Sequence, residues 1–253
     1  MMKETCRSLS KWPPESVVVQ IATFNEAASI GNLLEAIHCL LPAAYILVID
    51  DDSPDGTSDI VSEHGAKQEH IHLIRRVGRR GIGTATLEGL HYAIRQNASV
   101  AIHLDGDLSH NPVDLPRLLK ALSPATGEAF DIAIGSRKVK GGHTIGWSIK
   151  RHIASWLVAW FTRFVLRVPV RDPSSGFRAI RLQCLESMDL DGIATGYAFF
   201  EDFLCRAKRA GISMTEIPIT FTDRRFGESK VNLQEVCKSI RDLLKIASRT
   251  WFG

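Results

Sequence analysis

Two aspartates one residue apart, Asp105 and Asp107, follow the short apolar segment Val100–Leu104. Such a segment is typical of a buried strand, and residues i and i+2 of an extended chain point to the same side. Gly106 between them lets another group approach the backbone closely. Paired carboxylates repel each other unless a cation lies between them, and Mg²⁺ and Mn²⁺ favour carboxylate and phosphate oxygens. The motif indicates a metal–diphosphate site or, as the simpler alternative, an Asp-Gly turn between a strand and a helix.

The elements that must position these carboxylates alternate along the chain. The segments predicted as strands are 16–22, 45–49, 71–74, 100–104, 131–134 and 212–221, with amphipathic helices between most of them. This alternation predicts an α/β fold with a mostly parallel sheet covered on both faces. Ligands of such sheets bind outside the carboxyl ends of the strands. Polar residues follow three of the strands, in segments 23–26, 50–55 and 105–107, so we expect one shared site there.

Two further loops carry charge at strand ends. Segment 50–55 holds four aspartates within six residues, which is more than a turn requires, although some of them can bond their own loop. Segment 75–85 is basic and glycine-rich before a helix and resembles a phosphate loop. It lacks the Walker spacing, so the alternative is a flexible loop that caps the helix.

Charge is distributed unevenly over the 253 residues, of which 45% are hydrophobic. Residues 1–136 hold 11 Lys and Arg against 17 Asp and Glu, whereas residues 137–253 hold 20 against 11. An acidic half followed by a basic half favours a cation site first and an anionic partner second. The basic residues form no low-complexity arm, so nucleic acid is not a favoured partner. The length allows one large domain or two small ones.

The cysteines and the hydropathy pattern bear on location. The five cysteines include no Cys-x-x-Cys pair, so neither a disulfide framework nor a zinc site is indicated and a reducing compartment is expected. The first 16 residues lack a signal-peptide core, and no apolar run reaches the ~18 residues of a spanning helix. The sequence predicts a soluble or peripheral protein.

Two predicted helices combine basic and aromatic residues. The first, 151–168, contains Trp156 and Trp160, and the second, 232–249, carries a basic stripe of Lys238, Arg241, Lys245 and Arg249. Amphipathic helices of this kind lie in membrane interfaces, where Trp and Arg are both favourable. The alternative for each is an ordinary helix packed on the domain.

With these pieces placed, the chain resembles a family 2 glycosyltransferase of GT-A (Rossmann-like) fold. Within that family it is most similar to the dolichyl-phosphate (polyprenyl-phosphate) mannose synthases. The resemblance runs from about Val17 to Leu233 and rests on the order and spacing of seven segments: 22–26, 49–57, 81–85, 105–110, 135–137, 146–151 and 223–230. It implies a tail (1–15), a catalytic domain (16–231) and a C-terminal basic amphipathic helix (232–253).

The resemblance also implies roles for individual residues. Those expected to line the nucleoside pocket are Ala22, Phe24, Glu26, Ile49 and Asp51. Those expected to hold the metal and diphosphate are Asp105, Gly106, Asp107 and Ser109. Those expected to bind the phosphates or the donor sugar are Arg137, Arg224 and Lys230, with Arg151 on the acceptor phosphate. The catalytic set is then Asp107, Arg137, Arg151 and Arg224.

The implied reaction transfers mannose from GDP-mannose to a polyprenyl phosphate with Mg²⁺ or Mn²⁺, inverting the anomeric centre to give a β-linked product. The implied location is cytoplasmic, on the cytoplasmic face of a membrane, and a membrane-spanning partner subunit is one option. The alternatives are a related transferase with another donor, such as UDP-glucose, or another acceptor, or a non-catalytic nucleotide-sugar-binding subunit. Five positions depart from the family pattern: Ala22, Phe24, Asp52, Gly106 and Phe200 stand where proline, tyrosine, asparagine or glycine, alanine and glutamine are usual.

Overall fold

A seven-stranded sheet forms the centre of the computed structural model, which describes residues 16–123, 129–223 and 233–252. The strand order is β3-β2-β1-β4-β7-β5-β8, and only β7 runs antiparallel to its neighbours. The strands span Val17–Thr23 (β1), Tyr45–Asp50 (β2), Ile71–Arg75 (β3), Val100–Asp105 (β4), Ile132–Ser136 (β5), Arg178–Arg181 (β7) and Met214–Pro218 (β8). The predicted mostly parallel sheet is confirmed.

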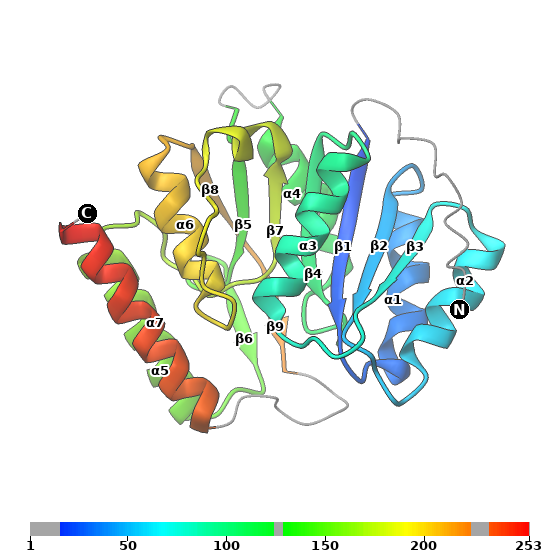
Figure 1. The fold of residues 1–253 in the computed structure, drawn as a ribbon, viewed down its shortest axis with the longest axis horizontal. Helices are drawn as coiled ribbons and strands as arrows, with labels where there is room; N and C mark the ends of the chain where they lie inside the picture. The colour runs from blue at the N-terminus through cyan, green and yellow to red at the C-terminus, as the bar shows by residue number, and fades with distance from the viewer. Residues whose placement is uncertain (1–15, 124–128, 224–232, 253) are drawn as a thin grey trace.

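Helices cover both faces of this sheet (Figure 1). One face carries α1 (Ala27–Leu40), α2 (Thr57–Lys67) and α4 (Leu115–Leu122), and the other carries α3 (Ile82–Arg95) and α6 (Phe199–Arg209). Two further helices, α5 (Ile149–Trp160) and α7 (Leu233–Phe252), lie at the β8 end of the molecule. Short helical turns span Pro112–Asp114, Phe161–Val165 and Leu182–Ser187.

The strands are buried on both faces because their side chains alternate between two cores. Val18, Leu47 and Ile49 pack into the core under α3 and α6, whereas Val19 and Ile21 pack into the core under α1 and α4. All five side chains are 0% exposed. This explains why the strands appear in the sequence as continuous apolar runs with no polar alternation.

The single strand predicted over 212–221 is wrong, because the segment divides at Pro218. Main-sheet pairing ends where Pro218 meets Ser136, and proline has no N–H to continue the ladder. The chain then forms β9 (Thr220–Thr222), which pairs with β6 (His143–Ile145) in a second, two-stranded sheet. Segment 141–147, which contains β6, has the glycine content of a loop in the sequence. A strand of three residues is too short to show an alternating hydrophobic pattern in the sequence, and it is stabilised only by hydrogen bonds to its partner strand.

The helix predicted over 151–168 also differs in detail. It begins at Ile149, where the Ser148 hydroxyl accepts the N–H of Arg151, and its last turn, Phe161–Val165, is π-helical. None of the helices in the described ranges is long and apolar enough to cross a membrane. The predicted tail, 1–15, lies outside the described residues.

The close contact between α3 and α6 gives a stability test. A Cβ added at Gly83 would lie 2.7 Å from Phe199 Cβ and 2.7 Å from the Thr195 carbonyl oxygen. We expect Gly83→Ala to lower the free energy of unfolding by about 1–3 kcal/mol through overpacking. Urea denaturation measures this change.

Gly31→Ala in α1 is the matched control. Its added Cβ would make only ordinary contacts, at 3.6 Å from His64 Nε2 and 3.7 Å from Ile60 Cγ2. This variant should gain about 0.5–1 kcal/mol from helix propensity. Equal stability changes in the two variants would contradict the packing described here.

Candidate active site

The carboxyl ends of β1, β2 and β4 lie side by side at one edge of the sheet. In the parallel pairing, Ala22 lies opposite Ile49 of β2 and Asp105 of β4. The Asp51 N–H also donates to the Thr23 carbonyl (3.0 Å), which joins the end of β2 to β1. The three polar segments therefore begin at one level, as the sequence predicted.

Two aspartates of the 50–55 segment hold the loop itself together. Asp50 is fully buried, and its carboxylate accepts three hydroxyl hydrogen bonds of 2.5–2.8 Å, from Thr23, Ser53 and Ser58. Asp55 accepts the backbone N–H of Ala27 (2.9 Å). Burial raises the pKa of Asp55, but hydrogen bonds from Thr57 and Ala27 outweigh it and the net pKa is lowered. These two side chains serve the loop.

Asp51, a predicted nucleoside-pocket residue, is bound on both carboxylate oxygens by the loop before α3. Arg76 Nε donates to Oδ1 (2.7 Å), and the Gly81 N–H donates to Oδ2 (2.8 Å). Arg76 is only 1% exposed and also donates to the Thr84 hydroxyl (3.0 Å). Sequence reasoning placed Arg76 in a basic, glycine-rich segment but missed its partner.

The other predicted nucleoside-pocket residues lie around the same strand ends. Phe24 is half-buried, and the Arg80 guanidinium lies 4.2 Å from its ring centroid. Ala22 is half-buried, whereas the Ile49 side chain is 0% exposed and belongs to the core under α3. Glu26 is the N-cap residue of α1. A ligand can therefore meet Ile49 only through its backbone.

The two central aspartates differ in exposure. The Asp105 side chain is 34% exposed, whereas Asp107 is 8% exposed and accepts the backbone N–H of Ser109 (3.0 Å). A Cβ at Gly106 would lie 2.9 Å from Thr23 Cγ2, so Thr23 makes the close approach that the glycine permits. Both aspartates thus lie at the carboxyl end of β4, next to the end of β1.

Each of these strand ends is followed by a left-handed residue. Asn25 after β1, Asp52 after β2 and Leu108 after β4 have φ of 59°, 57° and 60°. Asn and Asp tolerate this conformation, but at Leu108 it costs about 1–3 kcal/mol. Such strain is found where the surrounding structure fixes the backbone for a function, and here it directly follows Asp107.

The oxygen donors after β4 fit a divalent cation. The Ser109 hydroxyl oxygen is buried and has no hydrogen-bond partner in the described part of the chain. Together with the carboxylates of Asp105 and Asp107, it gives an all-oxygen set of the kind Mg²⁺ and Mn²⁺ prefer. Within the described ranges no group of three or more His, Cys, Asp or Glu side chains is placed to hold a metal.

Both histidines near this motif are packed in the interior. His103 is 1% exposed, and burial lowers its pKa to about 3. His110 lies 5.0 Å from the Phe177 ring and 5.1 Å from the Phe221 ring, and burial lowers its pKa. Its Nδ1 accepts the Asp105 N–H (3.3 Å), so this nitrogen carries no proton. Both side chains are neutral packing residues.

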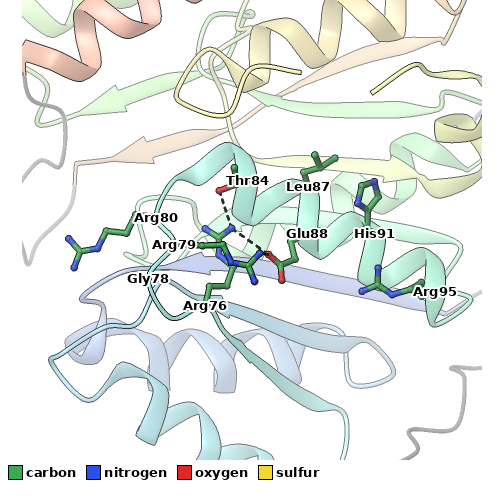
Figure 2. A pocket seen from close by; sticks show the side chains of 9 residues that line it. All are labelled: Arg76, Gly78, Arg79, Arg80, Thr84, Leu87, Glu88, His91 and Arg95. Atoms are coloured by element: carbon green, nitrogen blue, oxygen red, sulfur yellow. Dashed lines mark hydrogen bonds and ion pairs between the residues drawn. The ribbon is translucent and has the colours of Figure 1, made fainter. Parts of the chain in front are cut away.

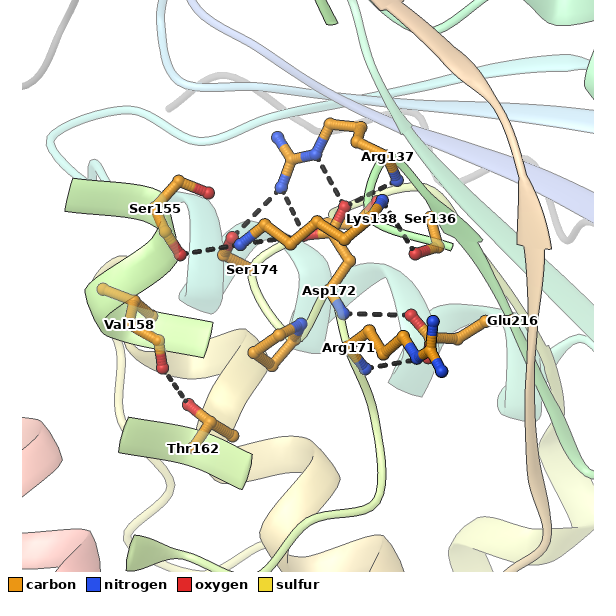
Figure 3. Close-up of polar contacts among 12 residues, drawn as sticks. Ser136, Arg137, Lys138, Ser155, Val158, Thr162, Arg171, Asp172, Ser174 and Glu216 are labelled. Atoms are coloured by element: carbon orange, nitrogen blue, oxygen red, sulfur yellow. Dashed lines mark hydrogen bonds and ion pairs between the residues drawn. The ribbon is translucent and has the colours of Figure 1, made fainter. Parts of the chain in front are cut away.

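Arg137, a predicted phosphate-binding residue, is clamped by Asp172 (Figure 3). Its Nε and Nη2 donate to the two carboxylate oxygens (2.7 and 2.6 Å), and its backbone N–H donates to Oδ2 (2.8 Å). Burial raises the pKa of Asp172, but the hydrogen bonds from Arg137 and the positive charges of Arg137 and Lys138 together outweigh it, so the net pKa is lowered. Asp172 begins a segment, 172–176, with the Pro, Ser and Gly content of an ordinary turn, and sequence reasoning missed this pair.

Lys138 links the same network to α5 (Figure 3). Its Nζ donates to the Ser155 carbonyl (2.6 Å) and lies 3.9 Å from Asp172 Oδ1. Burial lowers the pKa of Lys138. Behind Asp172, the Glu216 carboxylate accepts the backbone N–H groups of Arg171 and Asp172 (2.8 and 2.9 Å). The position of α5 is therefore tied to that of Arg137.

Trp147 brings Arg137 and Arg151 together. Their guanidinium carbons lie 4.9 and 4.3 Å from its ring centroid, within the range of a cation–π contact. Arg151 Nη1 also donates to Asp223 Oδ1 (2.6 Å). The predicted residues Arg224 and Lys230 lie outside the described residues.

Phe221 of β9 connects this basic group to the aspartates. Its ring lies 5.6 Å from Trp147 and 5.1 Å from His110, the residue that contacts Asp105. The next residue, Thr222, donates its N–H to the Ser109 carbonyl (3.1 Å). The structure thus joins the aspartates of the first half and the arginines of the second half through one aromatic residue that sequence reasoning missed.

A buried layer supports the end of β4. Phe200, at the position where glutamine was expected, packs 5.6 Å from His103 and 4.8 Å from the Arg178 guanidinium carbon. Burial lowers the pKa of Arg178 to about 10. Burial also raises the pKa of the adjacent Glu201 to about 7.

Comparison with known proteins is consistent with this architecture. Residues 18–188 match the glycosyl transferase family 2 profile. The chain belongs to glycosyl transferase family 2. It is a glycosyltransferase of GT-A fold, as the resemblance implied.

Two relatives and one solved structure illustrate the family. A polyprenol monophosphomannose synthase of Mycolicibacterium smegmatis is 37% identical over 222 residues, 87% of this chain and 82% of that protein. An undecaprenyl-phosphate mannosyltransferase of Micrococcus luteus is 36% identical over 217 residues, 85% of this chain and 87% of that protein. Glucosyl-3-phosphoglycerate synthase of Mycobacterium tuberculosis, solved with Mn²⁺, UDP and glucosyl-3-phosphoglycerate, shares the fold at 19% identity with a TM-score of 0.66, covering 93% of this chain and 80% of its own.

Glu201 provides a pH test of the buried layer. Its pKa is about 7 in the folded protein against 4.5 for the ordinary side chain, so the folded state binds the extra proton between these values. The proton on Glu201 therefore adds to the free energy of unfolding below pH 4.5, and this stabilisation is lost as the pH rises through 7. Glu201→Gln, which cannot ionise, should therefore gain stability relative to wild type between pH 5 and pH 8.

Urea unfolding of both proteins at these two pH values measures the difference. Glu186→Gln, the same change at an exposed position, controls for the loss of one acidic side chain. A stability difference between Glu201→Gln and wild type that does not change with pH would contradict the assignment.

Proposed function

We propose that the protein transfers mannose from GDP-mannose to a polyprenyl phosphate in a reaction that requires a divalent metal ion. The main supporting observation is that Phe221 lies between the Asp105–Asp107 pair on one side and Arg137 and Arg151 on the other. The first pair suits a metal-bound diphosphate, and the second suits an anionic acceptor. The two relatives at 36–37% identity are named for mannosyl transfer to polyprenyl phosphates.

The acceptor explains why the site needs no general base. A phosphate monoester has a second pKa near ~6 and is largely dianionic at neutral pH. Arg137 and Arg151 would hold this phosphate in line with the anomeric carbon, and Arg224 would add a further positive charge. Asp172 and Asp223 fix the orientation of the two arginines, so that little rotamer freedom is lost on binding. Attack opposite the leaving group gives a β-linked product from an α-linked donor.

Asp105, Asp107 and the Ser109 hydroxyl are the residues that would hold the metal, Mg²⁺ or Mn²⁺. A bound divalent ion supplies positive charge to the departing diphosphate. The fold neighbour solved with Mn²⁺ and UDP supports a divalent ion in this type of site. The nucleoside would lie against Ala22, Phe24, Glu26 and the backbone of Ile49, with Asp51, held by Arg76, facing the base. Gly106 and Lys230 complete the proposed donor contacts.

Asp107→Asn tests the aspartate pair. Because it removes one negative charge from the metal–diphosphate site, transfer should fall by roughly a hundredfold or more while the fold is kept. The assay follows radiolabelled mannose from GDP-mannose into a short polyprenyl phosphate, with Mg²⁺ or Mn²⁺ and with EDTA. Asp52→Asn, the same change at the end of β2, is the control and should keep most of the activity.

Wild-type turnover by Asp107→Asn, or full turnover in EDTA, would contradict the metal role. Transfer from UDP-glucose and not from GDP-mannose would keep the reaction class and replace the donor.

The paired helices α5 and α7 are proposed as the membrane-facing surface, on the cytoplasmic side because a reducing compartment is expected. Large apolar side chains that are 47–78% exposed line them: Ile149, Ile153, Trp156, Leu157, Trp160, Phe164, Ile240, Leu244 and Trp251. Trp251 Nε1 donates to the Val165 carbonyl (3.0 Å), which joins α7 to the end of the α5 segment. The exposed Lys238, Arg241, Lys245 and Arg249 favour anionic lipid by about 1 kcal/mol each.

A double variant, Trp156→Ser with Trp160→Ser, tests this surface. Both rings are exposed, so the fold should be kept while binding to vesicles of anionic phospholipid falls by roughly tenfold or more. Vesicle sedimentation gives the bound fraction. Val113→Ser removes a 60% exposed apolar side chain elsewhere and should bind as wild type does. Unchanged sedimentation of the double variant would contradict the proposal.

A further inference from the structure

A basic groove lies along α3, beginning at the loop that holds Asp51 and running toward the last turn of the helix (Figure 2). Its volume is about 650 Å³, and it is lined by Arg76, Gly78, Arg79, Arg80, Thr84, Leu87, Glu88, His91 and Arg95. Thr84, Glu88, His91 and Arg95 recur at intervals of four, three and four residues, with Leu87 beside Glu88, so the helical members share one face of α3. Figure 2 shows these side chains arranged in a row from the loop before α3 to its last turn.

Positive charge exceeds negative charge in this groove. Asp51 and Glu88 lie 2.5 and 3.6 Å from the Arg76 guanidinium, and Arg79 Nη1 lies 3.4 Å from the same Glu88. Arg79 is 69% exposed, and Arg80 and Arg95 are also exposed. Among the described residues that line the groove, Glu88 is thus the only carboxylate, beside three exposed arginines and an imidazole.

This concentration of arginine stands out in an acidic half of the chain. Five of the 11 basic residues among positions 1–136 are arginines between 75 and 95. A groove with one sign of charge and low-dielectric walls raises the local concentration of the opposite ion. Arginine forks match phosphate oxygens bidentately, and Leu87 is the only large apolar residue in the lining. The chemistry favours a small, highly charged anion over an apolar ligand.

We propose that this groove is a second anion-binding site, for a soluble small molecule that carries two or more linked phosphate groups. The distance along α3 from Thr84 to Arg95 is about 16 Å, so the long side chains at both ends must reach inward to contact one ligand, and a chain of linked phosphates meets them over more of this length than a single phosphate does. Arg79 and Arg80 would bind one end of the ligand, and His91 and Arg95 would bind the other.

One end of the groove adjoins the nucleoside side of the candidate site, where Arg76 holds Asp51 and Arg80 lies over Phe24, but its other end is separate from both surfaces already described. His91 and Arg95 lie in the last two turns of α3, toward the end of the helix remote from the aspartates. On the other side, α6 lies between α3 and α7 (Figure 1), so the membrane-facing surface does not include the groove. A soluble ligand therefore fits this position better than a lipid headgroup.

Calorimetric titration of the whole protein with tripolyphosphate tests the site. EDTA is present throughout, so the metal-dependent site after β4 does not take up the probe. Wild type should bind one tripolyphosphate, and Arg95→Gln should weaken binding roughly tenfold or more, as expected for a lost charge-assisted contact. Arg117→Gln, which removes one positive charge from α4, should bind as wild type does. Orthophosphate should bind much more weakly than tripolyphosphate.

Four results would overturn the proposal. The first is that wild type does not bind tripolyphosphate, and the second is that Arg95→Gln and Arg117→Gln lose tripolyphosphate affinity equally. The third is that Arg151→Gln loses tripolyphosphate affinity while Arg95→Gln does not. The fourth is that Arg95→Gln loses binding to anionic vesicles. The third result would place the probe on the proposed acceptor site, and the fourth would assign the groove to a lipid headgroup. The titration involves no sugar transfer, so its outcome is independent of the proposed reaction.

Discussion

The parallel pairing of β1 with β2 on one side and β4 on the other is the constraint on which the site depends. Its register sets Ala22 opposite both Ile49 and Asp105. A slip of one residue would turn Asp105 and Asp107 to the opposite face and send the core side chains of β4 into the wrong layer. Burial on both faces of the strands therefore fixes the place of the carboxylates as firmly as it fixes the core.

A second constraint places the two aspartates near the two arginines of the site but prevents direct ion pairs between them. The arginines that would receive an anion are paired with Asp172 and Asp223, whereas Asp105 and Asp107 lie across Phe221 from them. Aromatic rings separate the two groups: Phe221 contacts His110 on one side and Trp147 on the other. The acidic and basic halves of the chain thus meet in one site with each guanidinium already oriented.

The fold and the aspartate edge of the site could be predicted from the sequence because their signals are local. Apolar runs give the strands, and the residues that directly follow them must lie at the carboxyl edge. The basic side of the site could not be derived in this way. Asp172 reaches Arg137 across 35 residues from a segment that resembles an ordinary turn. The position of Phe221 depends on the end of β8 at Pro218 and on the pairing of β9 with β6. That pairing is a tertiary contact between segments far apart in the sequence.

In the proposed site, Asp105 and Asp107 hold a divalent ion together with a diphosphate. Electron paramagnetic resonance of Mn²⁺, titrated with and without GDP, measures this binding. We expect one Mn²⁺ to bind more tightly when GDP is present, with that binding lost in Asp105→Asn and kept in Asp52→Asn. Equal Mn²⁺ affinity of wild type and Asp105→Asn in the presence of GDP would show that this carboxylate does not hold the ion.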